Sequence, residues 1–94
     1  MVGKTSKTTR QLERYLKGAA NHWRLDILFL LEKKGELTLD EIIAALKGNQ
    51  KTFSSHTLKL AQAGLVRKRY QGRNVLHSLS PYGKQLCRFL TTLS

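Results

Sequence analysis

The sequence predicts a mainly α-helical domain that carries one small β-hairpin, and two patterns support this prediction. The first is the recurrence of apolar residues every three or four positions, which is typical of amphipathic helices. The second is an alternation of apolar and polar residues after Gly64, which is typical of strands. We expect helices over 12–20, 21–34, 38–48, 50–63 and 80–93, and strands over 65–70 and 74–79.

The first two predicted helices follow each other directly in the sequence. The stretch 12–20 is amphipathic, and Asn21 can cap the helix that follows it. That second helix ends with two lysines, whose charge suits a helix C-terminus, and then Gly35. Because it is apolar on most sides, we expect it to be the central helix of the core.

Two short helices with a tight turn between them come next. After a short extended link at Glu36-Leu37, the sequence TLDE at 38–41 forms a capping box that starts a helix. This helix stops at Gly48, and Asn49 heads the helix 50–63, so only three or four residues separate the two. Two short helices joined by a tight, glycine-containing turn form a helix-turn-helix pattern.

A hairpin and a final helix complete the predicted order. The two strands flank the sequence QGR at 71–73, which is typical of a glycine-containing turn. Ser80 can cap the last helix, with Pro81 at its first position. A helix-turn-helix followed by a basic hairpin is a winged helix, so we expect a winged helix-turn-helix fold.

The length of 94 residues allows one domain with one modest core. We expect a single winged helix-turn-helix domain over 11–94, which includes a terminal dimerisation helix, and a flexible basic arm over 1–10.

Charge is distributed very unevenly along the chain. The net charge is +11, yet all six acidic residues lie within 1–41. Residues 42–94 contain nine cationic residues and no acidic one. This asymmetry predicts a face in the second half that binds a polyanion. The alternative is a basic protein whose charge only keeps it soluble.

Several function classes find no support in the sequence. Cys87 is the single cysteine, which excludes an internal disulfide and a cysteine-rich zinc site. The sequence contains neither paired acids nor a glycine-rich phosphate loop, so nothing in it favours catalysis. We therefore expect neither an enzyme nor a cofactor or metal. The N-terminus is polar and the longest apolar run is 27–31, so we expect no signal peptide, no membrane span and a cytoplasmic location.

Three stretches in this order are similar to a known family. They are WRLDILFLLEKKGELTLDEI (23–42), SSHTLKLAQAGLV (54–66) and RKRYQGRNVLHSLSPYGKQL (67–86). On these residues the chain resembles the ArsR-type (ArsR/SmtB-like) winged helix-turn-helix repressors and, more distantly, the MarR type. The resemblance covers about residues 12–90.

The resemblance implies a homodimeric repressor that places helix 50–63 in the major groove of double-stranded DNA, with the hairpin 65–79 as a wing. The implied DNA-facing residues of the helix are Gln50, Lys51, Thr52, Ser54, Ser55, His56 and Lys59. Those of the wing are Arg69, Gln71 and Arg73, and Arg67 and Lys68 add charge to the same hairpin. The dimer interface is expected on the first and last helices, at Leu12, Tyr15, Leu16, Leu86, Phe89, Leu90 and Leu93.

The chain departs from the metal-sensing members of this family. Thr38 and Asp40 stand where those members carry a Cys-x-Cys pair, so no metal site is expected. A leucine of the family is replaced by Thr57, and Phe29 stands where a charged residue is common. No small-molecule effector is identified, and the operator cannot be named.

The chemistry of the helix 50–63 suits a base-reading role. Gln50 can pair bidentately with adenine, and serine and threonine hydroxyls can serve several bases. Lysines here would meet phosphates, and Arg73 could enter a narrow minor groove. His56 is either a base reader or a partly buried hydrogen-bonding residue. A nonspecific nucleic-acid binder and a protein adaptor stay open as alternative functions.

Two features of the last helix allow two readings each. The stripe of Leu86, Phe89, Leu90 and Leu93 is either core or dimer seam, and the short chain favours a seam. Cys87 lies between Lys84 and Arg88, whose charges would lower the pKa of its thiol, so it is a candidate redox residue. The other reading is a cysteine that only packs.

Overall fold

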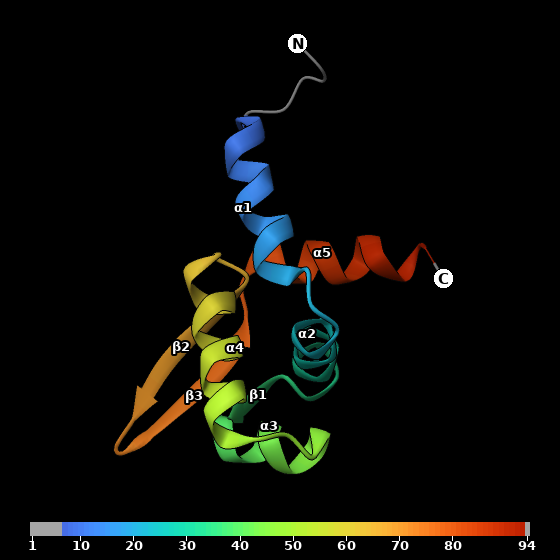
Figure 1. The fold of residues 1–94 in the computed structure, drawn as a ribbon. Coiled ribbons are helices and arrows are strands. Elements are labelled where there is room, and N and C mark those ends of the chain that lie inside the picture. The colour runs from blue at the N-terminus through green and yellow to red at the C-terminus, as the bar shows by residue number, and fades with distance from the viewer. Residues whose placement is uncertain (1–6, 94) are drawn as a thin grey trace.

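The computed structural model describes residues 7–93 and shows a winged helix-turn-helix fold (Figure 1). Its elements follow the predicted order of helices and strands. They are α1 (Thr9–Ala19), α2 (His22–Lys34), β1 (Glu36–Thr38), α3 (Leu39–Leu46), α4 (Gln50–Gln62), β2 (Val66–Gln71), β3 (Asn74–Leu79) and α5 (Pro81–Thr91).

The first helix begins earlier than predicted. Thr8 caps α1 by accepting a hydrogen bond from the backbone N–H of Gln11, and the Gln11 side chain accepts one from Thr8 in return. Thr9 and Arg10 are therefore helical and do not belong to the flexible arm expected over 1–10. Residues 1–6 of that arm lie outside the described residues.

The sheet has three antiparallel strands in the order β1-β3-β2. The hairpin β2–β3 was predicted, and its turn holds Gly72 at a φ of 61°, where glycine has no side chain to clash. The extended link at Glu36-Leu37 is strand β1, which pairs with β3 and places Leu37 opposite His77. Because β1 and β3 lie about 40 residues apart in the chain, periodicity alone could not reveal this pairing.

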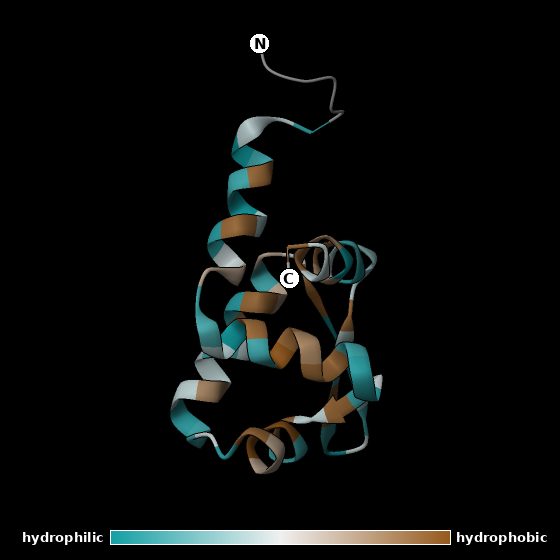
Figure 2. Cartoon of the chain, turned by 90° about the vertical axis from the view of Figure 1, so that its right-hand side faces the viewer, coloured by the Kyte–Doolittle hydropathy of each residue, from teal (hydrophilic) through white to brown (hydrophobic). Residues whose placement is uncertain are grey.

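The core is built around α2, as predicted. Ile27, Leu28 and Leu31 on this helix are buried, and they lie in one apolar cluster with Ile42 of α3 and Leu60 of α4. By contrast, α1 is largely exposed and buries only Ala19, and Figure 2 shows hydrophobic and hydrophilic residues alternating along it. Within residues 7–93, no helix combines the length and apolar character needed to cross a membrane.

Local capping fixes where the helices of the helix-turn-helix start. The predicted capping box forms, because Thr38 accepts from the N–H of Glu41 and the Glu41 carboxylate accepts from the N–H of Thr38. Asn49 likewise caps α4 by accepting from the N–H of Thr52 at 3.2 Å. The start of each helix is thus set by residues next to it in the sequence.

The turn between α3 and α4 depends on a glycine. Lys47 ends α3 in the left-handed conformation, with a φ of 54°, and Gly48 then passes directly over the ring of Phe53. A Cβ atom on residue 48 would lie 2.4–2.6 Å from three ring carbons of Phe53. Phe53 is almost fully buried, so its ring has little room to move away.

We expect Gly48→Ala to lower the free energy of unfolding by about 1–3 kcal/mol, the usual cost of overpacking a core. Urea denaturation followed by circular dichroism measures the change. The matched control is Gly48→Ala combined with Phe53→Leu, whose smaller side chain makes room for the methyl group. If the double variant is destabilised by the full sum of the two single changes, the proposed clash is wrong.

Candidate nucleic-acid interface

Helix α4 has one buried face and one exposed face. Phe53, Thr57 and Leu60 are buried against the core, as predicted. The hydroxyl of Thr57 donates a hydrogen bond to the carbonyl of Ser54 at 3.0 Å, which satisfies a polar group where the resemblance implied a leucine. The predicted recognition residues on the exposed side are Gln50, Lys51, Thr52, Ser54, Ser55 and Lys59.

The exposed face of α4 is free to bind a partner. Within residues 7–93, the side chains of Gln50, Lys51 and Ser55 have no hydrogen-bond or ion-pair partner, whereas the Thr52 hydroxyl donates to the Asn49 carbonyl. The first turn of α4 contains no acidic residue. Its backbone N–H groups therefore add a positive potential that no side chain of this turn cancels.

His56 is held by an arginine that the sequence analysis missed. Arg24 of α2 donates from Nε to Nδ1 of His56 at 3.2 Å and from Nη1 to the carbonyl of Gly18 at 3.2 Å. One guanidinium thus joins the end of α1, helix α2 and helix α4. The pair lies 32 residues apart in the chain, and no local pattern indicates it.

The contact with Arg24 fixes which nitrogen of His56 carries the proton. Because Nδ1 accepts a hydrogen bond, the ring is neutral and carries its proton on Nε2. The pKa of His56 lies below its ordinary value of 6.5, mainly because the ring is partly buried. The nearby charges of Arg24 and Lys59, and His22, lower this pKa as well. The ring is half-buried, so of its two nitrogens only Nε2 is left for a ligand.

The wing divides its side chains between two faces. Successive residues of a strand point to opposite sides, so Arg67, Arg69 and Gln71 share one face and Lys68 and Tyr70 share the other. All of these predicted wing residues, with Arg73 at the turn, are exposed.

Arg69 already has a partner within the chain. Its guanidinium donates to both carboxylate oxygens of Glu36 on β1, at 2.7 and 3.1 Å. This pairing lowers the pKa of Glu36 and raises the pKa of Arg69. Because Arg69 is 57% exposed, this ion pair stabilises the wing root only modestly. Because Arg69 is paired with Glu36, it offers less free charge than its neighbours on the wing.

A cleft of about 310 Å³ brings the wing and α4 together. Lys68, Tyr70 and Arg73 line it from the wing, and Ser54 lines it from α4. Asp40 at the start of α3 is the acidic residue of its lining. The arrangement places two cations of the wing beside the exposed hydroxyl of the helix, which suits a strand of phosphates.

A second surface, on α1 and α5, is apolar. Leu12, Leu16, Phe89 and Leu93 are 36–68% exposed, and all four lie on these two helices or just past the end of α5. A groove of about 330 Å³ on this surface is lined in part by Tyr15 and Leu86, and also by Tyr82, which the sequence analysis missed. These residues, with half-buried Leu90, form the α1–α5 seam. Exposed apolar patches of this kind mark interaction sites.

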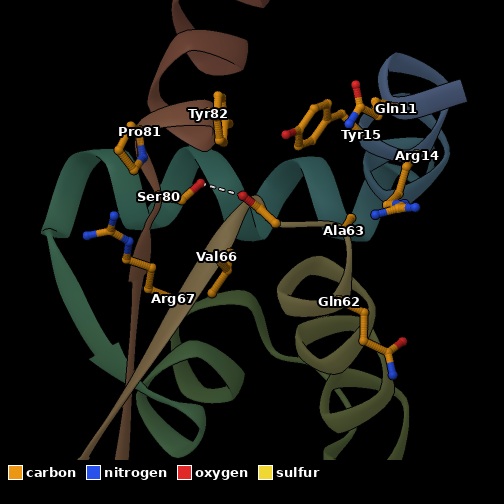
Figure 3. A pocket seen from close by; sticks show the side chains of 11 residues that line it. Gln11, Arg14, Tyr15, Gln62, Ala63, Val66, Arg67, Ser80, Pro81 and Tyr82 are labelled. Carbon is orange, nitrogen blue, oxygen red and sulfur yellow. Dashed lines mark hydrogen bonds between the residues drawn. The ribbon is translucent and has the colours of Figure 1, made fainter. Parts of the chain in front are cut away.

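Another cleft, of about 550 Å³, lies where α1, α5 and the root of the wing meet (Figure 3). Tyr15 and Tyr82 border it with their ring centres 5.2 Å apart. In the same region the Ser80 hydroxyl donates to the carbonyl of Gly64 and accepts from the N–H of Gly83. The start of α5 is thereby tied to the turn that follows α4.

The structure argues against the redox role considered for Cys87 and favours the alternative, a cysteine that only packs. The side chain is fully buried in the core, and burial raises the pKa of its thiol to about 11. Lys84 and Arg88 are close in sequence but exposed, so they do not stabilise a thiolate. Cys87 is a packing residue, since it is both inaccessible and protonated at neutral pH.

The described residues contain no group of three or more His, Cys, Asp or Glu side chains that could hold a metal ion. Thr38, at the position where a metal-sensing relative has a cysteine, is engaged in the capping box.

Comparison with known proteins links this chain to one family. The model of the family described as "Bacterial regulatory protein, arsR family" matches residues 22–68. The arsenical resistance operon repressor of Escherichia coli is 38% identical over 63 residues, which cover 67% of this chain and 54% of the repressor. The chain therefore spans about half the length of this curated relative.

Solved structures with similar folds cover nearly the whole chain. HlyU from Vibrio cholerae is 31% identical, with a TM-score of 0.82 over 95% of this chain and 97% of HlyU. A homodimeric winged helix-turn-helix DNA-binding domain from Mycobacterium bovis, described as a possible ArsR-family regulator, is 28% identical. Its TM-score is also 0.82, over 99% of this chain and 89% of that domain.

We expect the stability of the protein to decrease as the pH falls below about 6.5. His56 and His77 are buried to different degrees, and burial lowers the pKa of both from 6.5. The unfolded chain therefore binds more protons in this range, so stability that is present above pH 6.5 is lost as the pH falls through the folded pKa values.

Urea denaturation at pH 7.5 and pH 5.0 measures this loss. His56→Asn is the matched variant, because the Asn carbonyl can still accept from Arg24 but does not titrate. It should lose less stability than the native chain between the two pH values. An equal loss in both proteins would show that His56 does not contribute.

Proposed function

We propose that this chain, which belongs to the ArsR family of bacterial regulatory proteins, binds a specific double-stranded DNA sequence as a homodimer and represses transcription. The observation that carries the proposal is the exposed, acid-free face of α4 beside the cationic wing. The similarity to a repressor and to a homodimeric DNA-binding domain supports it.

Helix α4 would lie in the major groove with its N-terminal residues against the base edges. Gln50 has a free amide that can pair bidentately with adenine, and Ser54 and Ser55 offer hydroxyls that donate or accept. Lys51 and Lys59 would meet phosphates, which position the helix without reading sequence. The capped N-terminus of α4 adds its unpaired N–H groups to the same task.

The wing would hold the DNA next to the helix. Lys68 and Arg73 line the cleft that faces α4, so a phosphate strand lying there meets both elements. Arg73 at the wing tip is also placed to enter a narrow minor groove. Arg69 would contribute less, because Glu36 already neutralises it.

The α1–α5 seam would form the dimer interface. A two-fold axis through this seam would relate the α4 and wing of one protomer to those of its partner. The DNA site is therefore expected to be palindromic. The two half-sites would lie about one helical turn apart, roughly 34–36 Å from centre to centre.

We propose no catalytic role for the chain. Ser54, Ser55 and His56 follow one another in sequence, but Nδ1 of His56 is occupied by Arg24, where a catalytic histidine needs a carboxylate to orient it. The exposed hydroxyls of α4 are left to hydrogen bonding alone.

Binding to fluorescent DNA at two salt concentrations tests the function. We expect a selected palindrome to bind at least 1,000-fold more tightly than random DNA, with affinity falling steeply as salt rises. Gln50→Ala should reduce the preference for the palindrome by about tenfold or more. Lys68→Ala, which removes a proposed phosphate contact of the wing, should weaken binding to both DNAs alike and reduce the salt slope by about one per protomer.

Lys84→Ala is the matched control, because it removes the same charge from α5, where the side chain lines a cleft with Glu32 away from α4. It should leave both the affinity and the salt slope close to those of the native chain. Equal binding of all duplexes would identify a nonspecific binder. No binding at all would favour a protein adaptor with an acidic partner.

Sedimentation analysis tests the dimer separately. We expect Leu16→Glu and Phe89→Glu each to make the protein monomeric, because a charge in an apolar seam is not solvated or paired. The matched control is Leu58→Glu, which puts the same charge on an exposed leucine of α4 and should leave the dimer intact. A dimer that survives both seam variants would place the interface elsewhere.

A further inference from the structure

Leu58 is an apolar residue on the otherwise polar face of α4. Its side chain is 47% exposed, whereas Phe53, Thr57 and Leu60 of the same helix are buried. The core therefore does not explain why a leucine stands at this position.

The position of Leu58 on α4 puts it among the proposed base-reading residues. It follows Ser54 by four residues and Ser55 by three, so the three side chains are neighbours on one helix face. A side chain on a helix also leans toward the N-terminus. The methyl groups of Leu58 thus cover the helix surface next to the two serines.

The α1–α5 seam does not account for Leu58 either. The groove of that seam is lined by α1, α5 and their neighbours Lys7 and Leu65, and not by Leu58. The cleft between the wing and α4 is lined by Ser54 and Thr57 but not by Leu58. On the helix, Leu58 follows the exposed Lys51 by seven residues, or about two turns, so it lies on the exposed face that is proposed to enter the major groove.

We infer that Leu58 is a specificity-determining residue that contacts the C5-methyl group of a thymine in the bound DNA. This inference rests on the proposed function. Thymine is the base that presents an apolar group in the major groove, and apolar side chains recognise it there. Leu58 would thus select thymine over cytosine by a different chemistry from the hydrogen bonds of Gln50 and the serines.

Replacement of thymine by deoxyuridine tests this contact, because it removes the methyl group and leaves the hydrogen-bonding edge unchanged. A palindrome is first selected by the native protein from random DNA. Each thymine is then replaced in turn, symmetrically in both half-sites, and the dissociation constant is measured.

We expect one thymine position at which the native protein loses about fourfold in affinity per methyl group, or about 15-fold for both half-sites. Leu58→Ala should bind the two DNAs equally at that position. Gln62→Ala is the matched control, because it changes an exposed side chain one turn further along α4 that has no proposed role in DNA binding, and it should keep the preference for thymine.

The outcomes separate this inference from the function on which it rests. If the native protein selects a palindrome but no thymine replacement weakens binding, the inference is overturned and the function stands. The same holds if Leu58→Ala keeps the native preference for thymine. If the native protein selects no sequence, the proposed function fails and the inference fails with it.

Discussion

The packing of the Phe53 ring against the backbone of Gly48 is the contact on which the rest of the proposed interface depends. Phe53 lies on the inner face of α4, and Gly48 is the last residue but one before that helix. Their close approach fixes the angle between α3 and α4. Trp23 of α2 packs edge-on against the same ring, with 5.6 Å between ring centres, and so anchors the pair to the core. The direction of every exposed side chain on α4 follows from this arrangement.

Helix α4 is held to the rest of the fold at three levels, so its exposed face is positioned before any ligand arrives. Phe53 fixes the first turns, Arg24 holds His56 in the middle, and Ser80 binds the carbonyl of Gly64 just beyond the C-terminal end. A surface that is already ordered loses less conformational entropy on binding. The polar residues of α4 can therefore combine base recognition with a low ordering cost, while the wing supplies most of the free charge.

Much of the fold could be predicted from the sequence because its signals are local. Periodicity and caps located the helices, and the capping box at Thr38 formed as expected. The pairing of β1, the Arg24–His56 contact and the Arg69–Glu36 ion pair could not be predicted, since each joins residues more than 30 positions apart. The redox interpretation of Cys87 has a related weakness: it relied on two cations nearby in the sequence, whereas the fold buries the thiol and raises its pKa. The roles assigned to the exposed residues of α4 and the wing stay predictions.

The Ser80–Gly83 segment has a practical consequence for protein engineering. The carbonyl of Leu65, at the root of the wing, accepts a hydrogen bond from Ser80, and a Cβ atom on Gly83 would lie 2.2 Å from the same oxygen. A fragment cut after β3 would lose the hydrogen bond from Ser80 and the close packing of Gly83 on Leu65. It would also expose the buried end of β2. The smallest version of this domain that keeps a firmly seated wing must therefore extend past Gly83, and fusions are better placed beyond the last turn of α5.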